Sequence, residues 1–109
     1  MEKKLTNDAD KLLGYMYKNY LERRKTGESR DNAIRMGDVE GIAQVAPKTK
    51  HEDIADLCRE LDRAGYLQVY YADDTVYTSW LTPDAIIYLE NRFKDGIKGV
   101  LGFLSQFIP

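Results

Sequence analysis

The chain has 109 residues, which is enough for one domain with one modest core. Its net charge of −2 excludes nucleic-acid binding driven by an overall positive charge. The single cysteine, Cys58, excludes an internal disulfide, and no apolar segment reaches the about 20 residues that cross a bilayer. The first residues lack the apolar stretch of a signal peptide. We therefore expect a soluble, cytoplasmic protein without a membrane partner.

Apolar residues recur at three- and four-residue spacing after Asn7, which predicts a first helix with Asn7 as its N-cap. A basic last turn leads to Gly27, the expected stop of this helix. The polar residues 27–33 predict a loop, and Ile34 to Met36 a short strand at most.

Two further helices are expected in the middle of the chain. The second spans Asp38 to Val45, and Pro47 closes it. The third begins at Thr49 or Lys50 and runs to Ala64, with Gly65 at the position typical of a helix-ending glycine. Its buried stripe is expected to consist of Ile54, Leu57, Cys58 and Leu61.

Two aromatic-rich strands follow, at 66–71 and 76–80, with Asp73-Asp74 as a tight turn midway between them. Pairing about this turn predicts a core-covering face with the pairs Leu67 and Trp80, Val69 and Thr78, and Tyr71 and Val76. The opposite face would then carry Tyr66, Gln68, Tyr70, Tyr77, Ser79 and Leu81.

Thr82 is expected to cap a fourth helix that has Pro83 at its first position. The apolar spacing that follows predicts one continuous helical face, formed by Ile86, Leu89, Phe93, Ile97, Val100, Leu104 and Phe107. Gly96, Gly99 and Gly102 would each cost about 1 kcal/mol inside such a helix, so a kink or stop near Gly96 is the alternative. The fold class is thus mainly α with a small antiparallel β-hairpin, an α+β fold with an extended C-terminal helix.

The C-terminal segment is a candidate for self-association. Residues 1–95 would form the domain and residues 96–109 an apolar helical extension, with Phe103, Leu104, Phe107 and Ile108 exposed on a lone monomer. We expect a homodimer built on Phe93, Ile97, Val100, Leu101, Leu104 and Phe107. The alternatives are that this segment packs back on its own domain or lies on a membrane surface.

Two stretches carry a resemblance to a known family. "IAQVAPKTKHEDIADLCRELDRAGYL" resembles the tandem helices and the entry into the wing of the winged helix-turn-helix domain. "WLTPDAIIYLE" is similar to the start of the helix that follows the wing in many bacterial regulators. The resemblance covers about residues 7–93 and extends to small YjcQ-type winged-helix proteins of Gram-positive bacteria and their prophages. It implies a DNA-binding fold, although a fold alone does not establish function.

The same resemblance implies where DNA would bind. The start of the third helix, Lys48, Thr49, Lys50 and His51, would enter the major groove, with the two lysines on phosphates. Arg59 lies on the same helix, and Arg23, Arg24 and Lys25 would add phosphate contacts if the basic segment folds beside it. The alternative for this segment is a solvated helix end whose cations complement the helix dipole. Acidic residues oppose this function, because carboxylates repel the phosphate backbone: they are Glu52, Asp53 and Asp56 in the helix and Asp73 and Asp74 at the turn.

The sequence therefore supports two functions. One is a small transcriptional regulator that binds duplex DNA as a homodimer. The other is a protein–protein interaction module of prophage or plasmid origin, which fits the eight tyrosines. We expect no enzyme, cofactor or metal, because His51 and Cys58 would lie about 10 Å apart along a helix, too far for a nucleophile and its base.

Overall fold

The computed structural model describes residues 4–107; residues 1–3 and 108–109, which include Ile108 of the predicted apolar patch, lie outside the described residues. The predicted fold class is confirmed: helices predominate and the two strands form one antiparallel hairpin. In chain order the elements are α1 (Asn7–Lys25), α2 (Arg30–Ala33), α3 (Val39–Val45), α4 (His51–Arg63), β1 (Leu67–Ala72), β2 (Thr75–Leu81), α5 (Pro83–Arg92), α6 (Ile97–Leu104) and a 3₁₀ turn (Ser105–Phe107).

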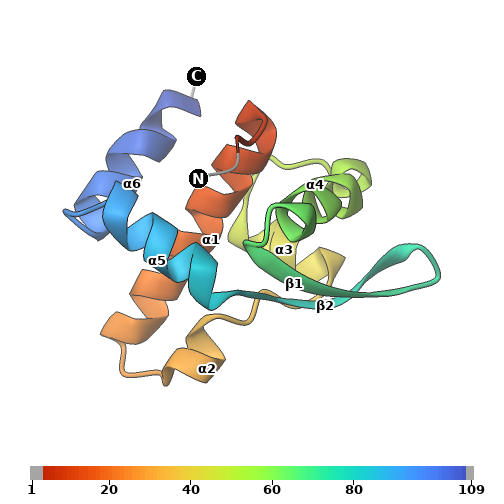
Figure 1. Ribbon diagram of the computed structural model, residues 1–109, viewed down its shortest axis with the longest axis horizontal. Helices are drawn as coiled ribbons and strands as arrows, with labels where there is room; N and C mark the ends of the chain where they lie inside the picture. The colour runs from red at the N-terminus through yellow and green to blue at the C-terminus, as the bar shows by residue number, and fades with distance from the viewer. Residues whose placement is uncertain (1–3, 108–109) are drawn as a thin grey trace.

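The longest helix, α1, lies in the middle of the fold (Figure 1). Helices α3 and α4 lie on one side of α1 and α5 and α6 on the other, while α2 lies near its C-terminal end. The hairpin begins beside α4 and extends outward, so that its tip projects past the helices. The hairpin tip and the C-terminal end of α1 therefore lie at opposite sides of the protein.

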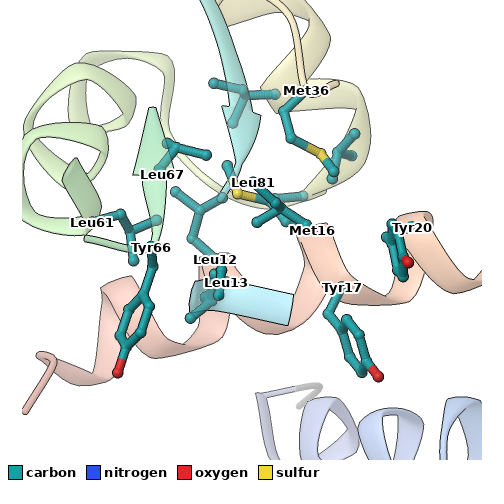
Figure 2. Packing of buried hydrophobic residues seen from close by; sticks show 14 of the residues in the cluster. Leu12, Leu13, Met16, Tyr17, Tyr20, Met36, Leu61, Tyr66, Leu67 and Leu81 are labelled. Carbon is teal, nitrogen blue, oxygen red and sulfur yellow. The ribbon is translucent and has the colours of Figure 1, made fainter. Parts of the chain in front are cut away.

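One apolar core joins all of these elements. Leu12, Leu13 and Met16 of α1 are fully buried and meet Leu67 of β1 and Leu81 of β2, as Figure 2 shows. The predicted stripe of α4, from Ile54 to Leu61, is buried in the same cluster. Burial of a leucine side chain contributes about 1.5 to 3 kcal/mol, so this central layer supplies much of the stability.

Helix ends follow local capping chemistry, with one correction. The cap of α1 is Thr6 rather than Asn7, because the Thr6 hydroxyl accepts a hydrogen bond from the Ala9 backbone N–H at 3.3 Å. Both Thr6 donors also reach the Glu60 carboxylate of α4, at 2.7 and 2.8 Å. This second interaction favours Thr6 over Asn7 as the N-cap and connects the start of α1 to α4. A local sequence pattern does not reveal it.

Residues 27–33, predicted as a loop, contain the one-turn helix α2. Ser29 caps it by accepting from the Asn32 N–H at 3.2 Å, so the polar residues serve as a helix start. The predicted strand at Ile34 to Met36 is reduced to a single bridge between Arg35 and Trp80. Two backbone bonds support it: the Met36 N–H donates to the Ser79 carbonyl and the Leu81 N–H to the Ile34 carbonyl.

The hairpin forms with the predicted turn but with a different register. Tyr71 pairs with Val76 as expected, yet Tyr70 pairs with Thr78, so Tyr77 is an extra residue that bulges from β2. The bulge shifts the rest of β2 by one position. Trp80 is consequently not opposite Leu67. The predicted core face is confirmed for Leu67, Val69 and Val76, which are buried. It is wrong for Thr78 and Trp80, which are partly exposed, and for Tyr71, which is 39% exposed.

The register shift turns Ser79 and Leu81 inward, although both were assigned to the outer face. Leu81 pairs with Leu67 and is fully buried. Ser79 is also fully buried. Its hydroxyl donates a hydrogen bond to the Gly37 carbonyl at 2.8 Å, which offsets the desolvation penalty of a buried polar group.

The C-terminal part departs from the continuous helix. Helix α5 is capped by Thr82 with Pro83 at its first turn, as predicted, but it ends at Arg92. Gly96 has φ +64, a conformation that favours glycine, and it allows the chain to turn back into α6. Helix α6 packs against α1 near Gly14, where an added Cβ would lie 3.0 Å from the Phe103 ring. The predicted continuous helix is therefore wrong, and the alternative of a stop near Gly96 is confirmed.

Candidate nucleic-acid and protein interfaces

The start of α4 brings part of the predicted DNA-binding set together. Lys48, Thr49 and Lys50 line a shallow cleft of about 150 Å³ with Lys11 of α1. Lys48 has φ +72 and lies exposed in the turn before the helix. Lys50 is the N-cap and supplies no capping hydrogen bond from its side chain. Three lysines thus surround a helix start, an arrangement suited to a phosphate.

Carboxylates lie in and around the same cleft. Asp8 and Asp53 are part of its lining. His51, the fourth predicted residue, lies with its Nδ1 3.5 Å from a carboxylate oxygen of Glu40 in α3. The next two exposed acids of α4 are Glu52 and Asp56. The local charge is therefore mixed.

Arg59, another predicted DNA contact, is part of the structure that holds the hairpin. Its guanidinium lies 5.6 Å from the centroid of the Tyr71 ring, and Nη2 donates to the Asp74 carbonyl at 3.3 Å. Arg59 therefore fixes the hairpin tip to α4.

The basic residues at the end of α1 lie away from the lysine cleft. Arg23 donates to the carbonyls of Ala33 and Arg35, and Arg24 donates to the Glu28 carbonyl at 3.1 Å. Lys25 is 14 residues beyond Lys11 on the same helix, about 20 Å along the axis. The fold thus brings residues 48–51 together and places residues 23–25 elsewhere, where the two arginines hold the following loop.

The predicted dimerisation residues divide into buried and exposed groups. Phe93, Val100 and Leu104 are 8%, 0% and 3% exposed and belong to the protein's own core. Leu101 is 45% exposed, while Ile97 and Phe107 are partly buried. The packing of α6 on α1 corresponds to the alternative in which this segment returns to its own domain. In this fold only the second group is accessible to another chain.

The hairpin carries exposed aromatic side chains that were not among the predicted site residues. Tyr77, at the bulge, is 69% exposed and Tyr70 is 53% exposed. The ring of Tyr70 lies 5.4 Å from the partly exposed ring of Trp80, a contact that the register shift creates. In contrast, Tyr66 is buried and stacked on Tyr88 of α5, at 4.8 Å between ring centroids. We call Tyr70, Tyr77 and Trp80 the hairpin aromatics. The sequence placed Tyr70 and Tyr77 on the outer face of the hairpin, but it assigned Trp80 to the core-covering face.

Within residues 4–107 no group of three or more His, Cys, Asp or Glu side chains could hold a metal ion. None of the helices in this range is long and apolar enough to span a membrane. Comparisons with protein-family models, with curated proteins and with solved structures found no match. The class that the observations define is a small α+β protein with a projecting aromatic hairpin.

Proposed function

We propose that this protein is a protein–protein interaction module that binds its partner through the hairpin aromatics. The observation that carries the proposal is the exposure of Tyr70 and Tyr77 on the hairpin, at 53% and 69%, with the Tyr70 ring beside that of Trp80. Exposure of an aromatic ring to water is unfavourable in the free protein, and burial of the ring by a partner removes this penalty. Tyrosine and tryptophan are over-represented among the residues that dominate binding energy. Their grouping on a projecting hairpin supports docking of a partner there.

The charges near the hairpin favour a basic partner segment. Asp73 and Asp74 form the exposed tip. The pKa of Tyr71 is raised, first by burial and then by the nearby carboxylate of Asp62. An arginine or lysine of the partner could therefore lie over a tyrosine ring and near a carboxylate together, as Arg59 lies over Tyr71 within this chain.

Site-specific crosslinking tests this proposal. A photoreactive phenylalanine analogue in place of Tyr77, introduced in the native host, should crosslink to a defined protein, whereas the same analogue in place of Lys25 should not. The purified partner should then bind the double variant Tyr70→Ser/Tyr77→Ser at least about tenfold more weakly than the wild type. An unchanged affinity of that variant would contradict the proposal.

A specific observation also favours a second function, a winged-helix transcriptional regulator in the cytoplasm. The order of α1, α3, α4 and the hairpin agrees with the order that the resemblance implies. Lys11, Lys48 and Lys50 surround the start of α4, the helix that would enter the major groove. A homodimer suited to two half-sites and built on the predicted dimerisation residues would use Leu101 and the exposed parts of Ile97 and Phe107.

Fluorescence anisotropy with duplex DNA at about 50 mM salt separates the two functions. A regulator should lose affinity with increasing salt, and three lysine–phosphate contacts predict a slope of about −3 in log K against log salt concentration. The variant Lys48→Glu/Lys50→Glu should abolish this binding, while Lys25→Glu serves as the control. Absence of binding by the wild type would leave the interaction module as the function.

A further inference from the structure

An apolar groove lies between α2 and α5, beside the base of the hairpin. It has a volume of about 330 Å³ and an apolar floor that consists of Ile34, Leu81, Ile86 and Ile87. Ile87 is 58% exposed although it is a large aliphatic side chain on a well-formed helix. Exposed apolar surface that gathers in a concavity is typical of a binding site rather than of scattered surface residues.

The groove leads to the hairpin aromatics. A second cleft, of about 160 Å³, shares Asp31 and Ile34 with the groove and extends to Trp80. The Trp80 ring in turn contacts Tyr70. A partner bound on the hairpin aromatics can therefore continue into the groove along Trp80 and Ile34, past the ion pair of Asp31 and Arg35.

Two opposite charges at the groove have side chains that form no hydrogen bond or ion pair among residues 4–107: Arg30 of α2 and Glu90 of α5. The pKa of Tyr17 is raised, first by burial and then by the charge of Glu90. Asp31, a third charged residue of the lining, lies 3.4 Å from Arg35 in an exposed ion pair. Besides this pair, the groove presents one cation from α2 and one anion from α5.

We propose that this groove binds a segment of the partner protein in which a bulky apolar residue lies between an acidic and a basic residue. The acidic residue pairs with Arg30, the basic residue with Glu90, and the apolar side chain packs on Ile34, Ile86 and Ile87. This inference rests on the proposed function as a protein-interaction module, and it names the chemistry of the partner. The groove alone is too small for a second copy of the fold, since a stable interface buries roughly 800 Å² on each partner.

The length and charge of the groove favour such a segment over a small organic ion. The groove follows one face of α5 from Pro83 to Glu90, seven residues or about 10 Å, which matches two turns of a bound helix. Glu90 and Asp31 would repel a small anion, and Arg30 would repel a small cation. A segment with both charges uses both walls.

Peptide selection tests the proposal with the full-length protein. A random peptide library displayed on phage is selected against the wild type and counter-selected against Ile87→Glu, an exposed position where a substitution leaves the core intact. The selected peptides should share an apolar residue flanked by an acid on one side and a base on the other. Synthetic copies should change the fluorescence of Trp80, the single tryptophan of the chain, and bind Ile87→Glu at least about tenfold more weakly.

Charge exchange gives the decisive control. The variant Arg30→Glu/Glu90→Arg should prefer peptides with the acid and the base interchanged. Failure to obtain peptides that distinguish the wild type from Ile87→Glu, or a charge preference that does not follow the exchange, would overturn the proposal. Circular dichroism confirms that each variant is folded.

Binding of the native partner to the two sets of variants separates this inference from the proposed function. If Tyr70→Ser/Tyr77→Ser loses the native partner while Ile87→Glu keeps it, the hairpin function stands and the groove proposal fails. If Ile87→Glu loses the native partner and the tyrosine variant keeps it, the groove is the docking site and the hairpin function fails.

Discussion

Asp10 of α1 and Arg92 of α5 are joined by two parallel hydrogen bonds, although they lie 82 residues apart in the sequence. Arg92 Nη1 lies 2.5 Å from Asp10 Oδ1, and Arg92 Nη2 lies 2.9 Å from Asp10 Oδ2. The hydrogen bond with Asp10 is the main reason that the pKa of Arg92 is raised. The guanidinium also lies 4.5 Å from the centroid of the Phe103 ring of α6. Arg92 therefore connects the three helices α1, α5 and α6.

A double-mutant cycle should detect this connection in the free energy of unfolding. We expect a coupling of about 1 kcal/mol between Asp10→Ala and Arg92→Met, because a bidentate, partly buried pair is stronger than an exposed one. Methionine retains part of the contact with Phe103. Urea denaturation measures the four free energies.

The matched control for this cycle is the pair Lys18 and Glu22, 3.2 Å apart on the surface of α1. Its lysine precedes its glutamate, the weaker of the two orientations along a helix, so its coupling should not exceed about 0.5 kcal/mol. Equal couplings for the two pairs would show that Asp10 and Arg92 contribute no more than a surface ion pair.

The sequence predicted both helices of this pair but not the pair itself. The apolar spacing located α1 and the Thr82-Pro83 start located α5, since these signals act within a few residues of the chain. The contact between Asp10 and Arg92 depends on how the helices pack, which no local pattern encodes. The same limit applies to Thr6, whose choice as the N-cap depends on Glu60 of α4.

Helix α6 should stabilise the monomer through its buried side. Leu104→Ala is expected to lower the free energy of unfolding by about 2 to 5 kcal/mol, because Leu104 is 3% exposed and its loss leaves a cavity against α1. Leu101→Ala, at the 45% exposed neighbour, should change it by less than about 0.5 kcal/mol. Thermal and urea unfolding of the two variants compare them directly.

Light scattering on the wild type and on Leu101→Lys examines self-association separately. If Leu101 served a dimer, Leu101→Lys would halve the mass in solution without unfolding the chain. If α6 acts only within its own chain, the mass stays unchanged and only the buried substitution alters stability. A strong loss of stability from Leu101→Ala with an unchanged mass would contradict the assigned burial.

The turn between the strands should accept a stabilising substitution. Asp73 and Asp74 have φ +52 and +62, and two successive positive φ values define the type I′ turn that favours Asn-Gly. Asp73→Asn/Asp74→Gly should therefore raise the free energy of unfolding by about 1 kcal/mol. Alanine adopts positive φ values poorly, so Asp73→Ala/Asp74→Ala should lower the free energy of unfolding. Equal stability of both variants would show that the turn is not under conformational strain.

The hairpin also shows why its turn was predictable and its register was not. The Asp-Asp turn is a local signal, and it fixed the pairing of Tyr71 with Val76. The bulge at Tyr77 depends on distant groups, because the inward Ser79 requires the Gly37 carbonyl and Leu81 requires the space beside Leu12 and Leu13. One inserted residue moved Trp80 from the predicted core face to a partly exposed position beside Tyr70, whereas Tyr70 and Tyr77 lie on the outer side as predicted.

Cys58 should behave as an inert core residue at neutral pH. It is fully buried, and this burial raises its pKa from 9.0 to about 12. Because the thiolate is the reactive form, an aromatic disulfide reagent should react with the native protein only after unfolding. The measured reaction rate in urea should therefore follow the unfolded fraction.

The same shift predicts how stability depends on pH. Since the folded state holds the thiol proton more tightly, the contribution of Cys58 is complete below pH 9 and is lost as the pH rises to about 12. The difference in free energy of unfolding between the wild type and Cys58→Ala isolates this contribution from the titrating tyrosines, which both proteins share. We expect this difference to be constant from pH 6 to 8. Above about pH 9 the wild type should lose stability relative to Cys58→Ala. A difference that stays constant up to pH 11 would show that the thiol is not shielded from water in the folded chain.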